Sequence, residues 1–465
     1  MSFDPSVRPR DHFTPRRGWM NDPNGLIHHD GEFHLFFQHH THALVHGPIS
    51  WGHAVSTDLL TWAELPTAIA ATADQHVWSG SVVHDAGNTS GLGTAGAGPL
   101  VALWTGRVTA TERQSQSLSF STDRGRTWTP YADNPVLDIG STAFRDPKVL
   151  RHDGAWVMVV VLADARTVEL YRSDDLLRWE HWSSFGPEGS VDGVWECPDL
   201  VRVPVEGSGD VRWVLLVSVF DGAPAGGSGM QYFVGELDDA GFRSTQPARW
   251  LDHGADLYAG VSYADAPGAE PVVQAWMSNW QYAESVPATE FRGAMTAPRR
   301  LALRPYDDEL GLVQRPVVRD GTEVVALHDE PLDGTTLPVT ATSYRVVAEV
   351  ETGTASRFGL HVREGAGERT TVVVDTGART VSLDRTASGE TGFHPAFAAV
   401  HTAPLPAVGD VVRIEVLVDV SSVEVFVDEG AVALTDQVFP SPASAGVSVF
   451  AEGGTAVLRT ISVTA

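Results

Sequence analysis

Three acidic residues stand in sequence contexts that could support chemistry on a sugar. Asp22 lies in "WMNDPNG", Asp146 in "FRDPK" and Glu196 in "WECPDL". Each carboxyl group has a neighbour that could tune its charge: Asn21, Arg145 and Trp195, in that order. A sugar ring stacks on an aromatic side chain, while carboxylates and amides hold its hydroxyl groups. The stretch from Trp19 to Asp22 therefore favours a carbohydrate site.

Each acidic residue also has a simpler interpretation when it is considered alone. An Asp before Pro is commonly a turn residue. Arg145 and Asp146 could form a surface ion pair worth ~0–1 kcal/mol, and Glu196 could be a charge at the edge of a strand. The motifs together favour a shared site, because they lie one or two structural repeats apart and have aromatic neighbours.

The elements that must position these residues are β-strands. Segments such as "GEFHLFFQ", "PLVALWTG", "WVMVVVLA" and "RWVLLVSVF" are rich in β-branched and aromatic residues, and turn residues separate them. No long window has the periodicity of an amphipathic helix. The sequence therefore predicts an all-β protein.

A repeat runs through the first two thirds of the chain. The stretches "STDLLTW", "STDRGRTW" and "SDDLLRW" share a Ser-x-Asp turn followed by Trp. Asp22, the "WSGS" stretch, Asp146, Glu196 and Asp256 follow at steps of about 50 to 65 residues, enough for four short strands. Four-stranded units repeated radially form a β-propeller, and residues 1–310 hold five of them. Their inner strands meet at one axis, so distant residues can form one funnel.

The pattern of apolar and polar residues changes after residue 310. We expect a linker over residues 311–329 and a β-sandwich over residues 330–465, where strands alternate cleanly between apolar and polar residues. This second region contains no Trp and no acidic–aromatic cluster of its own. We expect it to support the propeller structurally.

Composition narrows the classes of function and partner. Acidic residues outnumber basic ones by 59 to 32, and the net charge of −27 argues against nucleic acid and anionic membranes as partners. No apolar run approaches the roughly 20 residues of a membrane helix. No signal peptide is visible, so a cytoplasmic location is expected, or secretion if a leader was removed. The single cysteine, Cys197, excludes an internal disulfide and a Cys-based zinc site. The oligomeric state stays open.

The order "WMNDPNG", "FRDPK", "WECPDL" resembles glycoside hydrolase family 32, the β-fructosidases, which include invertases, exo-inulinases and levanases. The resemblance continues in "WGHAVSTDLLTW", "WSGS", "RGAMTAPRRLAL" and "VDVSSVEVFVDEG", so that it covers nearly the whole chain. It implies a five-bladed β-propeller followed by a C-terminal β-sandwich, in agreement with the repeat.

The resemblance also implies roles for the three acidic residues. Asp22 would be the nucleophile, Glu196 the general acid/base, and Asp146 the transition-state stabiliser, held with Arg145 against sugar hydroxyls. The residues expected to line the fructose pocket are Trp19, Asn21, Gln38, Trp51, Trp78, Ser79 and Trp276, with Trp280 and Asp256 as weaker transfers. No metal or other cofactor is implied.

Two stretches depart from the family pattern. His39, His40 and His42 stand where an aromatic-Gln-Tyr-Asn-Pro run is usual, although Gln38 is retained. These histidines could bind a metal, but a reshaped pocket rim is the favoured interpretation. Phe291 stands where a Trp is common, which we interpret as another rim change.

The predicted function is a retaining exo-β-fructosidase. It would remove terminal fructose from levan- or inulin-type fructans, fructo-oligosaccharides and sucrose. The alternatives are a sucrose-selective invertase or a fructosyltransferase and, outside the enzymes, a fructan-binding protein. The intact Asp22, Asp146 and Glu196 argue against the last.

Overall fold

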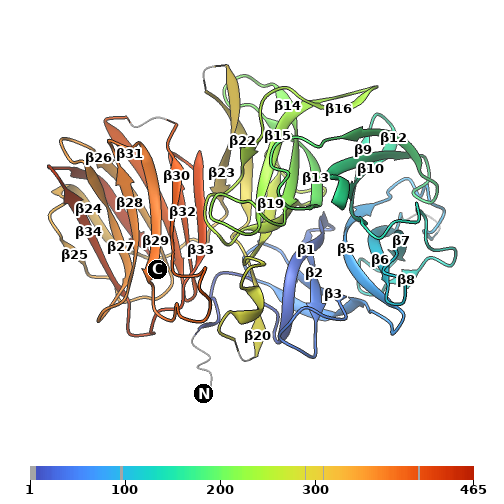
Figure 1. Ribbon diagram of the computed structural model, residues 1–465, viewed down its shortest axis with the longest axis horizontal. Coiled ribbons are helices and arrows are strands. Elements are labelled where there is room, and N and C mark those ends of the chain that lie inside the picture. The colour runs from blue at the N-terminus through green and yellow to red at the C-terminus, as the bar shows by residue number, and fades with distance from the viewer. Residues whose placement is uncertain (1–6, 95–97, 289, 307, 407–408) are drawn as a thin grey trace.

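The computed structural model describes residues 7–94, 98–288, 290–306, 308–406 and 409–465. Figure 1 shows two domains side by side, with the blue-to-yellow part of the chain in one and the orange-to-red part in the other. Across these ranges the chain is built of strands, with short 3-10 turns and no α-helix. No helix there is long and apolar enough to cross a membrane. The prediction of an all-β protein is confirmed.

The first domain contains five antiparallel sheets arranged as blades. The first three are β1 (Gly18–His29), β2 (Glu32–His40), β3 (Ser50–Ser56) and β4 (Ala63–Ile69); β5 (Gln75–His84), β6 (Leu100–Val108), β7 (Gln114–Ser121) and β8 (Thr129–Pro130); and β9 (Phe144–His152), β10 (Ala155–Leu162), β11 (Thr167–Ser173) and β12 (Glu180–Phe185). The fourth is β13 (Trp195–Pro204), β14 (Val211–Val219), β15 (Gly229–Asp238), β16 (Gly241–Ser244) and β17 (Arg249–Trp250). The fifth is β18 (Tyr258–Ser262), β19 (Val272–Met277), β21 (Ala294–Met295), β22 (Arg299–Tyr306) and β23 (Glu309–Pro316).

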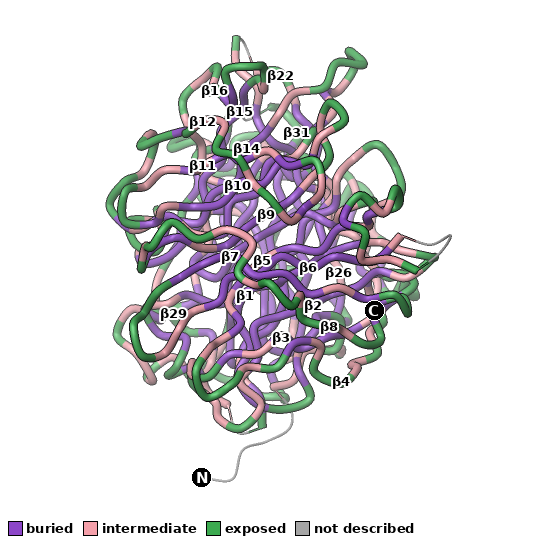
Figure 2. The backbone as a smooth tube through the Cα atoms, turned by 90° about the vertical axis from the view of Figure 1, so that its right-hand side faces the viewer, coloured by how far each residue is buried: buried purple, intermediate pink, exposed green. Residues whose placement is uncertain are grey.

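The blades close into a ring. The innermost strands β1, β5, β9, β13 and β18 each contact the next, and β18 contacts β1. A short strand, β20 (Phe291–Arg292), returns from the end of the propeller and pairs in parallel with β1. Strands in the middle of a blade are buried on both faces because neighbouring blades cover them. This explains continuous apolar runs such as "AWVMVVVL" in β10, which lie in the buried centre of Figure 2.

The repeated Ser-x-Asp…Trp turns occupy equivalent places. They join the third and fourth strands of blades one, two and three. In the first of them, Ser56 accepts a hydrogen bond from the backbone N–H of Leu59, and Trp62 Nε1 donates to the carbonyl of Leu59 at 3.0 Å. Trp128 and Trp179 make the same bond at 3.1 and 3.0 Å. The sequence repeat therefore marks a turn that the Ser, the Asp and the Trp stabilise together.

The second domain is a sandwich of two six-stranded sheets, β24-β35-β26-β31-β32-β33 and β25-β34-β27-β28-β29-β30. Their bounds are β24 (Glu323–Pro331), β25 (Thr336–Leu337), β26 (Tyr344–Glu351), β27 (Arg357–Glu364), β28 (Arg369–Asp375), β29 (Thr380–Ala387), β30 (Val400–Pro404), β31 (Val411–Asp419), β32 (Ser422–Val427), β33 (Val432–Gln437), β34 (Gly446–Glu452) and β35 (Val457–Thr464). Alternate residues of β26 are buried between the sheets. β32 and β33 are buried at every position, and β33 contacts strands of the propeller on its outer side.

The segment between the domains is shorter than the linker expected over residues 311–329. Residues up to Pro316 belong to β23 and complete the fifth blade, and Glu323 already begins the sandwich. The burial of β23 does not alternate, since the four residues 311–314 are all buried, and its sequence therefore lacks the usual signal of a half-buried strand.

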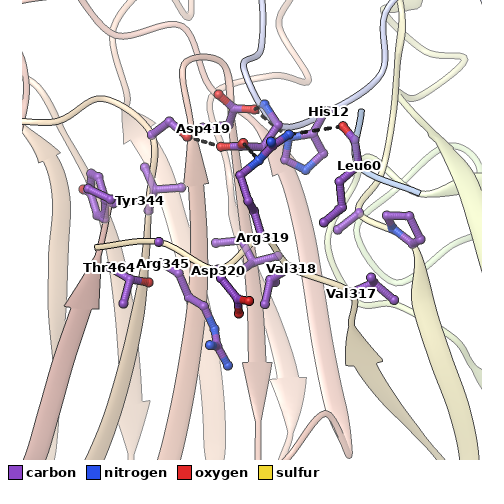
Figure 3. Close-up of a pocket in the computed structure, with 18 residues that line it drawn as sticks. His12, Leu60, Val317, Val318, Arg319, Asp320, Tyr344, Arg345, Asp419 and Thr464 are labelled. Atoms are coloured by element: carbon purple, nitrogen blue, oxygen red, sulfur yellow. Dashed lines mark hydrogen bonds and ion pairs between the residues drawn. The ribbon is translucent and has the colours of Figure 1, made fainter. Parts of the chain in front are cut away.

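A cavity of about 160 Å³ lies at this junction. Its apolar wall includes Leu60 of the propeller and Val317 and Val318 of the joining segment, opposite Tyr344 of the sandwich (Figure 3). Beside it, His12 contacts Asp419 and Glu424 of the sandwich. None of the three candidate acidic residues lines this cavity.

Candidate active site

The five innermost strands share an irregularity at the level of the candidate site. Against its neighbour, each carries one extra residue: between Met20 and Pro23 in β1, Val77 and Gly80 in β5, Arg145 and Lys148 in β9, Glu196 and Asp199 in β13, and Tyr258 and Val261 in β18. Such a bulge bends a strand and redirects its side chains. The five bulges bring the three acidic residues together at the propeller axis. We call this space the central funnel.

The bulges explain why the acidic residues precede proline or a Cys-Pro pair. Pro147 and Pro198 lie within a bulge and Pro23 at the end of one, positions that tolerate a residue without a backbone N–H. Asp146 and Cys197 have φ values of 65° and 45°. Non-glycine residues rarely adopt this left-handed conformation, and when they do they cluster at functional sites. The turn interpretation of these Asp-Pro pairs was therefore wrong.

Asp22 is buried at the funnel and is held by three donors. Ser79 Oγ donates to its Oδ2 at 2.6 Å, Asn21 Nδ2 to its Oδ1 at 2.9 Å, and Cys197 Sγ approaches Oδ2 at 3.5 Å. Burial raises the pKa of Asp22, the bonds from Ser79 and Asn21 lower it, and the charge of Glu196 raises it; the pKa stays above its ordinary value. The carboxyl group is thus aligned by donors but holds its proton to a higher pH than a solvated Asp.

Asp146 lies beside the same thiol. Its Oδ2 accepts the backbone N–H of Cys197 at 3.0 Å and lies 3.8 Å from Cys197 Sγ, and its own N–H donates to Thr105 Oγ1. Burial raises the pKa of Asp146 to about 7, although the Arg145 guanidinium lowers it, and the charges of Glu196 and Asp22 raise it further. Three carboxyl groups close together therefore do not all ionise at mildly acidic pH.

Glu196 has a different pair of partners from those expected. Arg145 donates to Glu196 Oε1 from Nη2 at 2.9 Å and from Nε at 3.1 Å, whereas its Nε lies 3.9 Å from Asp146. Tyr258 donates its hydroxyl to Glu196 Oε2 at 2.5 Å. Trp195, which we expected to tune Glu196, instead packs in the core between blades three and four and donates to the carbonyl of Ser190. Residues next to each other in a strand face opposite sides, which explains this error.

An aromatic cluster stands beside the carboxyl groups. The rings of Trp19, Trp276 and Trp280 lie 4.9 to 6.0 Å apart, and Trp78 and Tyr258 belong to the same cluster. The indole N–H groups of Trp78, Trp276 and Trp280 are buried and have no hydrogen-bond partner within the described ranges. An indole offers both an apolar face and a donor, so this wall can stack a sugar ring and bond its hydroxyls.

Two residues expected to line the pocket are buried and bonded within the first two blades. Gln38 is buried and donates to Asn24 Oδ1 at 2.6 Å, and Trp51 is buried and donates to the carbonyl of Trp78 at 3.0 Å. Their bonds reach the side chain of Asn24 in β1 and the backbone carbonyls of Val77 and Trp78 in β5. Trp19 has both roles, because it belongs to the wall and donates to Asn21 Oδ1 at 2.8 Å.

Asp256 does not reach the funnel. Its carboxylate is fully buried between the domains, where it accepts hydrogen bonds from Arg385, Tyr282 and the backbone of Gln437. Both carboxylate oxygens are engaged at this interface, so the structure places Asp256 apart from the residues that face the funnel. The residue of the fifth blade that completes the site is Tyr258, two positions further on, which the sequence analysis missed. Tyr258 follows Glu196 by one repeat step, and this spacing could have predicted that it belongs to the site.

The histidines at the end of β2 and in the turn after it do not converge. His39 bonds to the carbonyl of Arg17 and His40 to that of Val45, while His42 is exposed. Within the described residues, no three His, Cys, Asp or Glu side chains are placed to hold a metal ion together. Phe291 is buried beneath the Arg8 guanidinium, 3.9 Å from its ring centroid, and is not a rim residue.

Comparison with known proteins agrees with this architecture. The profile of the "Glycosyl hydrolases family 32 N-terminal domain" matches residues 12–316, and that of the "Glycosyl hydrolases family 32 C terminal" matches residues 315–465. The levanase of Bacillus subtilis is 40% identical over 99% of this chain and 70% of its own. The extracellular exo-inulinase of Aspergillus niger is 37% identical over 97% of this chain and 93% of its own. The crystal structure of exo-inulinase from Aspergillus awamori superposes with a TM-score of 0.92 at 36% identity, and covers 100% of this chain and 99% of that one.

The propeller with its buried carboxyl groups is thus that of a glycoside hydrolase. The chain belongs to glycosyl hydrolases family 32, and it is an enzyme of the β-fructofuranosidase type. The fold predicted from the sequence, a five-bladed propeller followed by a sandwich, is confirmed.

Proposed function

We propose that the protein is a retaining exo-β-fructosidase that hydrolyses terminal non-reducing β-D-fructofuranosyl residues of levan- or inulin-type fructans, fructo-oligosaccharides and sucrose. The observation that carries this proposal is the arrangement around Cys197. Its thiol lies 3.5 Å from Asp22 and 3.8 Å from Asp146, and Glu196 is the residue before it. The similarity to proteins named levanase and exo-inulinase supports a fructan as substrate.

The first step forms a covalent intermediate. An oxygen of ionised Asp22 attacks the anomeric C2 of fructose, and the bond between C2 and the leaving oxygen breaks. Glu196 transfers its proton to that oxygen, so that the leaving sugar departs as an alcohol. Ser79 and Asn21 fix the direction of attack, because each donates to a different oxygen of Asp22.

The second step releases fructose with its original configuration. Glu196, now ionised, takes a proton from water, whose oxygen attacks C2 from the face that the leaving group left, and the bond to Asp22 breaks. Asp146 is suited to stabilise the positive charge that develops on the sugar ring, because the backbone N–H of Cys197 fixes it in place. Retention requires carboxyl groups about 5–5.5 Å apart, as in other retaining glycosidases.

Exo action follows from the depth of the site. Asp22 is 9% and Asp146 6% exposed, and the Trp cluster packs with Cys197, whose thiol lies beside both carboxyl groups. A chain end can enter such a funnel, whereas an internal unit of a polymer would have to bend sharply.

Product analysis on sucrose, 1-kestose, inulin and levan tests the proposal. We expect free fructose as the first product from every active substrate, and NMR of the earliest product should detect the β-anomer. D22N and E196Q, both nearly isosteric, should lower turnover by about three orders of magnitude or more while the proteins stay folded. Wild-type-like turnover of either variant, or α-fructose as the first product, would refute the assigned roles.

The same assay separates the alternatives. Cleavage of sucrose alone would indicate an invertase, and oligosaccharides that lengthen at high sucrose would indicate a transferase. Binding of fructan without any cleavage would indicate a binding protein.

A further inference from the structure

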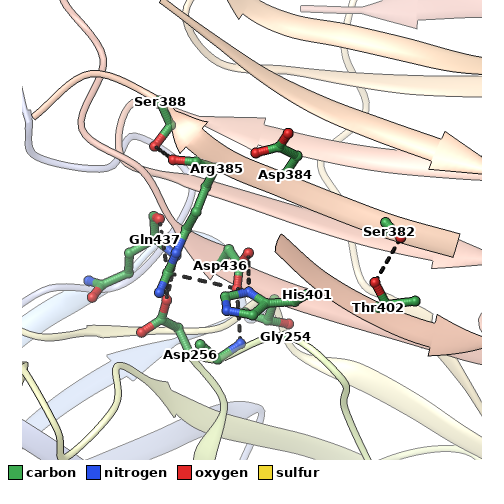
Figure 4. Close-up of polar contacts among 12 residues, drawn as sticks. Gly254, Asp256, Ser382, Asp384, Arg385, Ser388, His401, Thr402, Asp436 and Gln437 are labelled. Atoms are coloured by element: carbon green, nitrogen blue, oxygen red, sulfur yellow. Dashed lines mark hydrogen bonds and ion pairs between the residues drawn. The ribbon is translucent and has the colours of Figure 1, made fainter. Parts of the chain in front are cut away.

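One arginine of the sandwich contacts two segments of the propeller that lead into the funnel. Arg385, in β29, is fully buried, and it donates from Nη1 to Asp256 Oδ2 at 2.6 Å and from Nη2 to the Tyr282 hydroxyl at 2.9 Å. Its Nε donates to the carbonyl of Phe397 at 2.7 Å. Figure 4 shows this side chain reaching from its strand to Asp256, with Asp436 and Gln437 beside it.

Both partners of Arg385 lie two residues from a side chain of the site. Asp256 precedes Tyr258, whose hydroxyl donates to Glu196. Tyr282 follows Trp280, which packs on Trp19 and Trp276. A single residue joins Asp256 to Tyr258, the first residue of β18, and Tyr282 closes the turn that contains Trp280, where its N–H donates to the carbonyl of Asn279 at 3.1 Å. At so short a separation along the chain, a displacement of Asp256 or Tyr282 should also displace Tyr258 or Trp280.

The two propeller segments are also joined to each other. The Tyr282 hydroxyl donates to Asp256 Oδ1 at 2.7 Å, and Asn279 Nδ2 donates to the carbonyl of Ala255 at 2.9 Å. On the sandwich side, the backbone N–H of Ala255 donates to Asp436, and that of Asp256 to the carbonyl of Thr435. The segments therefore take their position from β33 and Arg385 rather than from the propeller alone.

We propose that Arg385 is a positioning residue for catalysis, through which the sandwich sets Tyr258 against Glu196 and Trp280 against the substrate. The proposal rests on the fructosidase function proposed above. Domain adhesion alone does not explain this arrangement, because a buried ion pair contributes little net stability but fixes geometry when its hydrogen bonds are complete.

The interface contains a matched control. Arg299 is equally buried and bonds to Asp252 at 2.9 Å and to Glu424 of the sandwich at 2.6 Å. It also donates to Gln314 Oε1 at 2.9 Å and to Thr435 Oγ1 at 2.5 Å. None of the four partners is within two residues of a side chain that faces the funnel, and the bond from the Asp256 N–H to the Thr435 carbonyl is a backbone bond that R299M leaves in place. R299M removes a buried interdomain arginine, as R385M does, but does not release Tyr258 or Trp280.

The test compares two substrates that differ in their need for a proton. Cleavage of sucrose needs the proton of Glu196, whereas fructosyl fluoride loses its leaving group without one. We expect R385M to lower kcat on sucrose by about tenfold or more. On fructosyl fluoride, measured with azide as acceptor so that release of the fructosyl-enzyme needs no general base, kcat should fall by less than about threefold. R299M should leave both values within about twofold of wild type. Y258F should show the R385M pattern, and in the R385M/Y258F double variant the two effects should not multiply.

Milder variants keep the test decisive if R385M does not fold. Y282F removes one partner of the guanidinium, and R385K keeps the charge opposite Asp256. Both should show the same difference between substrates to a smaller degree, with R385K nearer to wild type. Equal losses on both substrates, losses matched by R299M, or multiplicative effects with Y258F would overturn the positioning role.

A readout without substrate separates this proposal from the proposed function. In protein that contains 5-fluorotryptophan, the 19F resonance of Trp280, assigned with W280F, should shift in R385M and stay in place in R299M. An unmoved resonance in R385M would overturn the proposal. If the resonance moves in R385M but the wild-type protein cleaves no fructoside, the positioning proposal stands and the proposed fructosidase function is rejected.

Discussion

The substitution D146N should stabilise the protein while it abolishes catalysis. In the folded protein, burial and the charges of Glu196 and Asp22 raise the pKa of Asp146 to about 7 against the lowering effect of Arg145, whereas an unfolded Asp titrates near 3.8. The folded state therefore binds more protons between these values, and the free energy of unfolding falls as pH rises from about 4 to about 7. Asn cannot ionise, so the free energy of unfolding of D146N should not fall in this way as pH rises.

The magnitude follows from the shift. About three pKa units at 1.36 kcal/mol each give an upper value of about 4 kcal/mol at pH 8, and almost nothing at pH 4, where the carboxyl group is neutral in both states. For a propeller of this size, that corresponds to a rise in Tm of about 6 °C. The amide oxygen of Asn can still accept the N–H of Cys197, so the fold keeps its contact.

The assay is thermal and urea unfolding at pH values from 4 to 8, followed by tryptophan fluorescence. D85N is a control of opposite sign. Burial raises the pKa of Asp85, but hydrogen bonds donated by Thr89 and Ser90 lower it below its ordinary value. The ionised carboxylate therefore stabilises the folded state at pH values above the ordinary pKa of Asp, and D85N should be less stable than wild type at pH 8. If D146N is no more stable than wild type at pH 8, or is stabilised equally at pH 4, the electrostatic reasoning fails.

Three further predictions concern the funnel. With fructosyl fluoride as substrate, E196Q should move the acid limb of the pH profile of kcat/KM to lower pH, because the charge of Glu196 contributes to the raised pKa of Asp22. An acid limb that stays in place or moves to higher pH would contradict this. Burial and three nearby carboxylates raise the pKa of the Cys197 thiol well above its ordinary value, so native protein should resist iodoacetamide at pH 8 while unfolded protein reacts, as mass spectrometry would show. EDTA should leave activity within about twofold, and a loss that one divalent ion restores would revive the metal interpretation of His39, His40 and His42.

Much of the fold could be predicted from the sequence because its signals are local. Strand composition, the Ser-x-Asp…Trp turn and steps of about 50 to 65 residues are read without knowledge of long-range contacts. These signals predicted five blades, and the change in the pattern of apolar and polar residues predicted the sandwich. The boundary was less accurate, because β23 pairs with β22 in a hairpin and completes the fifth blade although its sequence does not alternate between apolar and polar residues.

The sequence by itself predicted the candidate carboxyl groups, Asp22, Asp146 and Glu196, and the Trp residues near them. Only the tertiary structure decided their partners. Arg145 turned out to bind Glu196, Trp195 to face the core and Asp256 to bind Arg385, while Tyr258 completes the site. Each of these depends on the direction of a side chain at a bulge or on a contact across more than 50 residues. Residue type and spacing specify the chemistry that is possible, but a bulge reverses the facing of neighbours, and that reversal depends on the packing of the whole ring.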